Sequence, residues 1–90
     1  MEFIHEGKAF RHYNAAGEMD AEITYASKGE GVIEANHTFV DSSLRGQGVA
    51  RRLVDRLADF ARDENLKIHP TCPYVVALFE KSTEYDDVKI

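Results

Sequence analysis

The chain has 90 residues, of which 43% are hydrophobic and 30% charged, and its net charge at pH 7 is −5. This composition is typical of one small globular domain over residues 1–90, and the acidic balance argues against general nucleic-acid binding, because proteins that bind the phosphate backbone are usually basic. The single cysteine excludes an internal disulfide, the short charged start predicts a cytoplasmic protein, and no apolar run reaches the roughly 18 residues that cross a membrane.

Three stretches of the N-terminal half have the pattern of strands, and short turns separate them. Residues 8–13 and 32–40 are rich in strand-forming residues, and residues 19–26 alternate between apolar and polar side chains. The turns at 14–18 and 28–31 contain glycine, which tolerates the backbone angles of tight turns. Short turns of this kind predict an antiparallel meander.

The third of these stretches is expected to place alternate side chains on opposite faces of the sheet. On that pattern His37 and Phe39 share a face with the apolar residues Ile33 and Ala35. A histidine in such company is more often a hydrogen-bonded core residue than a functional one.

The C-terminal half begins with an amphipathic helix over residues 48–64, where the hydrophobic period changes to 3.6. Its apolar stripe consists of Val49, Leu53, Val54, Leu57, Phe60 and Ala61. Asn65 is a suitable left-handed stop, and residues 66–71 are then expected to form a strand parallel to the one that ends at Val40.

Pro73 suits the first turn of a second, shorter helix over residues 73–81. Residues 84–90 form either a frayed acidic tail or an edge strand. The expected fold class is therefore α/β (α+β in some schemes), a mostly antiparallel sheet with one β-α-β crossover, one long helix and one shorter helix.

The loop before the long helix carries the most specific chemical signal in the chain. Gly46 and Gly48 flank Gln47 there, and five arginines lie between Arg45 and Arg62. A helix N-terminus presents unpaired N–H groups and about half a positive charge from the macrodipole. A glycine-bearing turn that enters a helix among arginines predicts a phosphate-binding cradle.

Two phosphate-loop patterns do not fit this segment, and a third does. The Walker A pattern G-x-x-x-x-G-K-[ST] is absent, and the dinucleotide pattern G-x-G-x-x-G fails at its third glycine, where Arg51 stands. The acyl-CoA pyrophosphate pattern Q/R-x-x-G-x-G/A matches residues 45–50 at every specified position. Small residues at Gly48 and Ala50 let the backbone approach a pyrophosphate closely. The alternative is a plain glycine loop with surface arginines.

With the segments 37–40, 44–50 and 70–74, residues 3–85 resemble a GNAT-type acetyltransferase domain, more narrowly its small single-domain YjdJ-like branch. The resemblance implies acetyl-CoA as cosubstrate and an amine as acceptor. It implies that the backbone of Phe39 and Val40 contacts the pantetheine arm. The residues expected to hold the pyrophosphate are Arg45, Gly46, Gln47, Gly48, Val49 and Ala50. Arg51 and Arg52 stand close enough to the loop to meet CoA phosphates.

Two departures from the resemblance bear on catalysis. The usual motif after the last strand is L-Y-E-K, whose tyrosine protonates the departing thiolate, whereas this chain has Phe79 in the run Leu78-Phe79-Glu80-Lys81. The chain also lacks the N-terminal helices and the final hairpin that usually build the acceptor pocket.

Cys72 is the candidate replacement for the missing tyrosine. It stands just before Pro73 at the expected start of a helix, where a thiol becomes more acidic and more nucleophilic. If the strands pair as expected, His37 approaches Cys72, and small YjdJ-like proteins resemble this chain in carrying both residues. Such a pair would accept the acetyl group from CoA or take up the amine proton. The alternative is an inert, buried cysteine.

The other titratable residues predict no further site. No C-x-x-C or H-x-x-x-H spacing is present, so no metal is expected. Arg56 and Arg62 are expected to pair with nearby aspartates, and Lys81 to be solvated. The predicted function is N-acetyl transfer from acetyl-CoA to an amine; the rivals are a CoA-binding sensor or interaction module and a purely structural domain. We expect a monomer or weak dimer that binds neither nucleic acid nor membrane.

Overall fold

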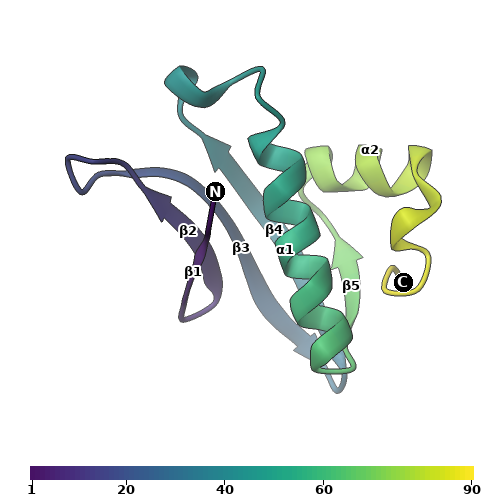
Figure 1. The fold of residues 1–90 in the computed structure, drawn as a ribbon. Helices are drawn as coiled ribbons and strands as arrows, with labels where there is room; N and C mark the ends of the chain where they lie inside the picture. The colour runs from purple at the N-terminus through teal and green to yellow at the C-terminus, as the bar shows by residue number, and fades with distance from the viewer.

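The structure is a computed structural model that describes residues 1–90, and it confirms the expected fold class. Its elements are β1 (Ile4–Glu6), β2 (Ala9–Tyr13), β3 (Met19–Gly29), β4 (Val32–Val40), the 3-10 turn η1 (Ser42–Leu44), α1 (Val49–Asp63), β5 (Lys67–Pro70), α2 (Pro73–Lys81) and the 3-10 turn η2 (Thr83–Tyr85). The sheet has the order β1-β2-β3-β4-β5, antiparallel except for the parallel pair β4–β5. The long helix α1 lies across one face of this sheet, with α2 beside it (Figure 1).

The strand β1 is an element that the sequence pattern did not predict, because three residues are too few to show alternation. It pairs with β2 through His5 opposite Phe10. The imidazole of His5 stacks on the Phe10 ring with centroids 4.3 Å apart, and its Nε2 lies 2.7 Å from the Tyr25 hydroxyl. Phe60 of α1 completes this aromatic cluster. Ring packing with the helix therefore fixes a strand that is too short to be stable by itself.

A β-bulge at Asn36 changes which side chains of β4 face the core. Ala35 pairs with Tyr25, but His37 pairs with Thr24, so Asn36 is one residue in excess on β4. Before the bulge, Ile33 and Ala35 are buried; after it, His37 and Phe39 are exposed. The prediction that all four share one face is wrong, because an extra residue reverses the alternation.

The helix α1 supplies the largest part of the core and ends as expected. Its buried residues are Val49, Leu53, Val54, Leu57, Ala58 and Ala61. Asn65 has φ +58°, and the N–H of Leu66 donates to the Ala61 carbonyl at 2.7 Å, which together form a Schellman end. The turn brings the chain directly into β5, so that α1 and β5 pack against β4 on one 18-residue hydrophobic core.

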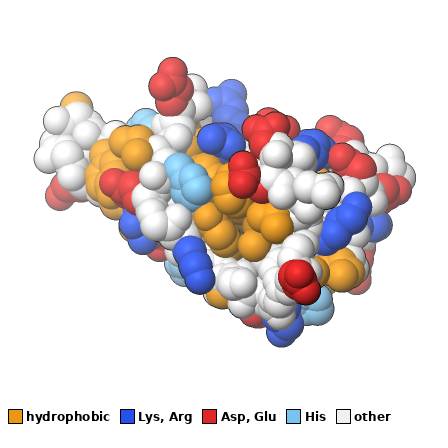
Figure 2. Space-filling view, turned by 90° about the horizontal axis from the view of Figure 1, so that it is seen from below, with side chains coloured by type: hydrophobic (Ala, Val, Ile, Leu, Met, Phe, Trp, Pro, Cys, Tyr) orange, Lys and Arg blue, Asp and Glu red, His pale blue; other side chains and the backbone are white.

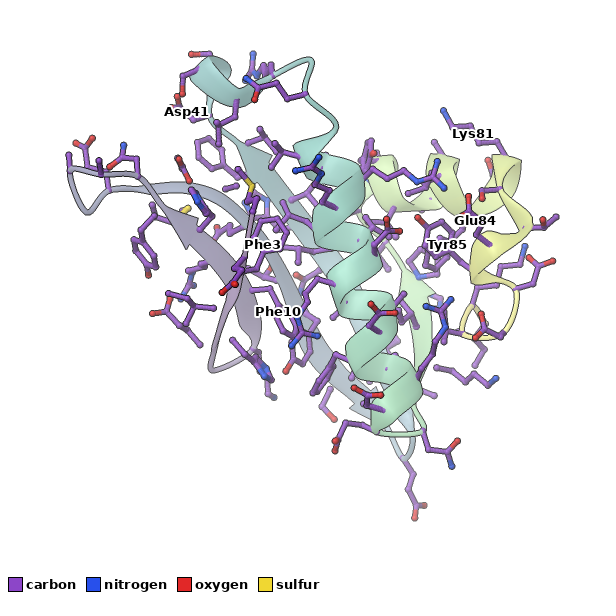
Figure 3. The ribbon with its side chains drawn as sticks, in the orientation of Figure 1. Phe3, Phe10, Asp41, Lys81, Glu84 and Tyr85 are labelled. Carbon is purple, nitrogen blue, oxygen red and sulfur yellow. The ribbon has the colours of Figure 1, made fainter.

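The C-terminal segment is neither frayed nor a full edge strand. Tyr85 and Val88 are buried, and Lys89 makes a single bridge to Ile68 on the outer edge of β5. The Tyr85 hydroxyl donates to a carboxylate oxygen of Asp55, and Arg51 donates to Tyr85 at 3.1 Å and pairs with Glu84. In Figure 3, Glu84 and Tyr85 of this segment lie on the side that faces α1. Arg62 in the last turn of α1 also binds Asp87, so the segment is bonded to α1 at both ends of the helix.

Replacing Tyr85 with phenylalanine is expected to destabilise the protein by about 1 kcal/mol, because the buried hydroxyl bonds to a carboxylate and a guanidinium. Burial and the bond to Asp55 raise the pKa of Tyr85 to about 12. The stability that this neutral hydroxyl confers is therefore complete below pH 10 and is lost as the pH rises towards 12. Urea unfolding of the parent and Tyr85→Phe at pH 8 and pH 11 checks both statements. Tyr74→Phe is the control, and an equal loss there would contradict the assignment.

The surface carries charges of both signs around apolar side chains, as Figure 2 shows for the end of the molecule seen from below. None of the helices is long and apolar enough to cross a membrane.

Candidate functional site

The parallel pair β4–β5 ends halfway along β4, and this opens a gap in the sheet. The last paired residues are Ala35 and Pro70. The N–H groups of Thr71 and Cys72 both donate to the Ala35 carbonyl at 3.0 Å, which turns the chain away from β4 and into α2. Beyond this point β4 continues to Val40 with β3 on one side only. The far half of β4 therefore has a free backbone edge that faces the start of α2.

The register of β3 and β4 decides which backbone groups point into this gap. Asp41 N–H donates to the Asp20 carbonyl at 2.8 Å. In an antiparallel ladder, every second pair of opposite residues exchanges hydrogen bonds, so the next bonded pair after Asp20–Asp41 is Glu22–Phe39. The backbone of Phe39 is therefore bonded to β3. The groups that face the gap belong to Thr38 and Val40. Of the two residues predicted to offer backbone groups, Val40 therefore faces the gap and Phe39 does not, and Thr38 is the other residue that faces it.

The loop between η1 and α1 has the geometry of an anion cradle. Gly46 and Gly48 have φ +79° and +74°, the left-handed region that favours glycine. A Cβ at either glycine would meet no protein atom within 4 Å, so the backbone is open to an approaching ligand. No hydrogen-bond acceptor within the protein is found for the six consecutive N–H groups of residues 46–51. These donors and the α1 dipole together favour a bound anion.

A pocket of about 150 Å³ lies between this loop and the two elements that flank the gap. It is lined by Val40, Leu44, Arg45, Gly46, Gly48, Val49, Ala50, Arg51 and Tyr74. Burial raises the pKa of Tyr74, whose hydroxyl therefore stays protonated and can donate a hydrogen bond. Leu44 and Tyr74 lie in segments that carry the family resemblance, but no role in the site was predicted for either residue. Tyr74 joins the site only because α2 starts where the gap opens.

The arginines around the loop have different environments. Arg45 is exposed and has no ion-pair partner. The hydroxyl and N–H of Ser43 hold the pKa of Asp41 below its ordinary value, and the nearby charge of Arg45 adds to this effect. Arg51 lines the pocket, but its guanidinium is bonded to Glu84 and Tyr85. The donor that Arg51 can offer to a ligand is therefore its backbone N–H.

Arg56 and Arg62, farther along α1, also differ in what their guanidinium groups contact. The guanidinium of Arg56 lies 4.6 Å from the Phe10 ring centroid, where it makes a cation–π contact instead of the expected ion pair. Arg62 forms the expected pair with Asp59 at 3.0 Å and also binds Asp87. Both side chains make contacts within the protein and neither lines the pocket at the loop.

Cys72 lies at the base of the gap, on the side of the sheet that α1 covers. Its Sγ is 3.4 Å from the Thr38 hydroxyl, and the residue is 7% exposed. Burial alone would raise the pKa of this thiol, but hydrogen bonds from Thr38 and from the N–H groups of Val75 and Tyr74 outweigh it, so the pKa lies below its ordinary value. The start of α2 thus favours the thiolate, as expected from the sequence.

His37 lies on the opposite side of β4 from Cys72, because adjacent residues of a strand point to opposite faces. Its Nε2 is 3.5 Å from a carboxylate oxygen of Glu22, and the side chain is 54% exposed. The expected direct approach of His37 to Cys72 is therefore wrong, since the bulge at Asn36 gives Thr38 that position. The two residues flank the gap from its two sides.

Phe79 and Lys81 contribute nothing polar to the gap. Phe79 is buried and stacks on the Tyr85 ring with centroids 5.0 Å apart. Lys81, at the far end of α2, is exposed and makes no ion pair. No hydroxyl therefore replaces the tyrosine of the L-Y-E-K motif at this position.

Comparison with known proteins identifies the family. Residues 9–88 match the GCN5-related N-acetyl-transferase family. The chain belongs to this family. The GNAT domain is 36% identical over 55 residues to Protein NATD1 of Gallus gallus, Mus musculus and Homo sapiens. That match covers 61% of the chain and 49–50% of those proteins, so the chain spans about half the length of the relatives that it matches.

Solved GNAT structures have the same fold. A GCN5-like candidate N-acetyltransferase of Staphylococcus aureus superposes with a TM-score of 0.84 and 32% identity, over 99% of this chain and 87% of the other. Rv2747 of Mycobacterium tuberculosis, in complex with CoA and NLQ, superposes with a TM-score of 0.57 and 17% identity, over 89% and 62% of the two chains. At that identity the second likeness concerns the fold alone.

The GNAT domain groups no three His, Cys, Asp or Glu side chains in a way that could hold a metal ion.

The acidity of Cys72 gives a prediction for this GNAT domain. Because the Thr38 hydroxyl supports the thiolate, Thr38→Val is expected to raise the pKa of Cys72 and to slow its alkylation at neutral pH by several-fold. Iodoacetamide alkylation followed by mass spectrometry over a pH series measures this change. Thr24→Val, which removes a hydroxyl that binds Asn36 instead, is the matched control. Equal alkylation profiles for all three proteins would rule out the role of Thr38.

Proposed function

We propose that this GNAT protein transfers an acetyl group from acetyl-CoA to an amine. The observation that carries the proposal is the row of six unpaired N–H groups at residues 46–51, next to the free edge of β4. An open cradle of donors at a helix N-terminus suits a pyrophosphate. A free strand edge suits an amide-containing chain such as pantetheine, which can pair with it as a further strand would.

The two features support the following order for the parts of acetyl-CoA along the site. The pyrophosphate binds at the loop, with the exposed Arg45 as its counter-charge and the Tyr74 hydroxyl as a further donor. The pantetheine amides pair with the backbone of Thr38 and Val40. The thioester then reaches the base of the gap, between Cys72 on the α1 side and His37 on the uncovered side of the sheet.

In this arrangement the amine nitrogen attacks the thioester carbonyl carbon from the uncovered face. A C–N bond forms, the C–S bond breaks, CoA leaves as a thiolate, and the amine proton passes to His37. The thiolate takes its proton from water, because Phe79 has no hydroxyl. In a covalent variant, the Cys72 thiolate first attacks the thioester, CoA leaves, and the amine then displaces Cys72 from the acetyl-enzyme.

The proposal is tested by the release of free CoA from acetyl-CoA in the presence of small amines, polyamines and lysine-containing peptides. Amine-dependent release, with the acetylated amine identified by mass spectrometry, supports transfer. Intact-mass measurement after incubation with acetyl-CoA alone shows whether Cys72 gains an acetyl group. An unmodified thiol together with amine-dependent release would select direct transfer.

The second candidate function is a CoA-binding module without useful transfer. Phe79 favours it, because the group that usually protonates the thiolate is absent, and so does the lack of an enclosed pocket around His37. Binding of acetyl-CoA with no release of CoA for any amine would select this function. No binding at millimolar acetyl-CoA would contradict both candidates.

A further inference from the structure

A chain of charged side chains crosses the uncovered face of the sheet and ends at His37. Arg11 on β2 donates through Nε to Glu22 on β3 at 2.8 Å. The other carboxylate oxygen of Glu22 lies 3.5 Å from His37 Nε2 on β4. Arg11 also reaches Glu6 at 3.5 Å, and Glu6 accepts a hydrogen bond from the Tyr13 hydroxyl at 2.5 Å. Glu22 is the only carboxylate of this group that faces His37.

We propose that Glu22 is a positioning residue that holds His37 as a base towards the acceptor amine. The proposal rests on the proposed acetyl transfer, and it assigns a role to a side chain that no sequence motif identifies. Glu22 is only 14% exposed and is fixed by Arg11, whereas His37 is 54% exposed. A fixed carboxylate next to an exposed imidazole can restrict both the orientation and the tautomer of that imidazole.

The tautomer follows from hydrogen-bond chemistry. Glu22 faces Nε2 at 3.5 Å, and an ionised carboxylate only accepts hydrogen bonds, so this contact favours the tautomer of neutral His37 that carries its proton on Nε2. The lone pair is then on Nδ1, for which no hydrogen bond within the protein is found, and the side chain as a whole is 54% exposed. Nδ1 is thus the atom that takes the proton of an arriving amine. The contact with Glu22 keeps the Nε2 edge of the imidazole towards β3 and leaves Nδ1 on the other side of the ring.

The isosteric variant Glu22→Gln separates this role from simple support of the fold. Its amide oxygen still accepts from Arg11, but its NH₂ group now faces Nε2 and favours a proton on Nδ1 instead. The matched control is Glu6→Gln, which changes the other carboxylate on Arg11 without facing His37. Both variants keep the volume and the Arg11 contact of the parent.

The first measurement needs no activity. Long-range ¹H–¹⁵N spectra of the free protein at neutral pH report which imidazole nitrogen carries the proton. We expect His37 protonated on Nε2 in the parent and in Glu6→Gln, and a shift towards Nδ1 in Glu22→Gln. An unchanged tautomer in Glu22→Gln would overturn the proposal, whether or not the protein transfers acetyl groups.

The second measurement is a double-mutant cycle on amine-dependent CoA release. Glu22→Gln is expected to lower kcat on the order of 10-fold, with KM for acetyl-CoA unchanged, by analogy with metal sites, where losing the partner that orients a histidine ligand costs about 10- to 100-fold. In a His37→Ala background the same change is expected to have less than about a 2-fold effect. Equal losses in both backgrounds would show that Glu22 acts independently of His37 and would refute the positioning role.

Discussion

Replacing His37 with alanine is expected to slow acetyl transfer by about 10²- to 10⁴-fold, which is the range that a general base contributes. The imidazole is 54% exposed and packs in no core cluster, so the variant keeps its fold. It also lies on the far side of β4 from Thr38 and Cys72, so acetyl-CoA binding is expected to stay within about 2-fold of the parent. Steady-state kinetics with a saturating amine and a separate binding titration measure the two quantities.

The control for this change is His69→Ala, on the paired part of β5, which removes an imidazole outside the gap. We expect near-parental turnover for it. Parental turnover in His37→Ala would remove His37 from the mechanism and would favour a thioester attacked without a protein base. A joint loss of binding and turnover would instead place His37 in the CoA site.

The second large effect is expected at the loop, where Gly48→Ala should weaken CoA binding by about 10- to 100-fold. The added methyl points into space that is empty in the protein, so it meets no protein neighbour. It does meet a pyrophosphate held by the N–H groups of residues 46–51 and displaces at least one charged hydrogen bond, which is worth about 1.5–3 kcal/mol. Isothermal titration with CoA gives the dissociation constant directly.

Gly31→Ala is a closely matched control for this experiment. Gly31 has φ +73° against +74° for Gly48, and its added Cβ also meets nothing within 4 Å, but it lies in the β3–β4 hairpin. Both variants are expected to lose about 1 kcal/mol of stability from the left-handed backbone, while only Gly48→Ala loses CoA affinity. Equal affinity in the two variants would contradict a pyrophosphate at the loop.

Much of the fold could be predicted because hydrophobic period and turn residues agree with each other. Helices α1 and α2 lie within one residue of the predicted bounds, and Asn65 and Pro73 mark an end and a start as expected. The three residues of β1 could not be predicted, because their pairing depends on the His5–Phe10 stack, a tertiary contact. The burial of Tyr85 likewise depends on Asp55 and Arg51, which lie about 30 residues away in sequence.

The candidate site could likewise be predicted only where it depends on residues that are close in sequence. The loop was predictable, because its glycines and the helix that follows are local in sequence. The arrangement around the gap was not, because it depends on the single extra residue at Asn36, which places Thr38 beside Cys72 and turns His37 towards Glu22. A bulge of one residue changes no local propensity, and it becomes visible only in the register between β3 and β4.

The most direct test of the account is an NMR titration of the ¹⁵N-labelled protein with acetyl-CoA, followed at the backbone amides. The six N–H groups of residues 46–51 are free in the protein, so each should shift on binding, together with Thr38 and Val40 on the free edge of β4. We expect saturable shifts at these amides, with the largest at the loop. No shift at millimolar acetyl-CoA, or shifts confined to the separate pocket lined by Met1, Phe3 and Arg52, would contradict it.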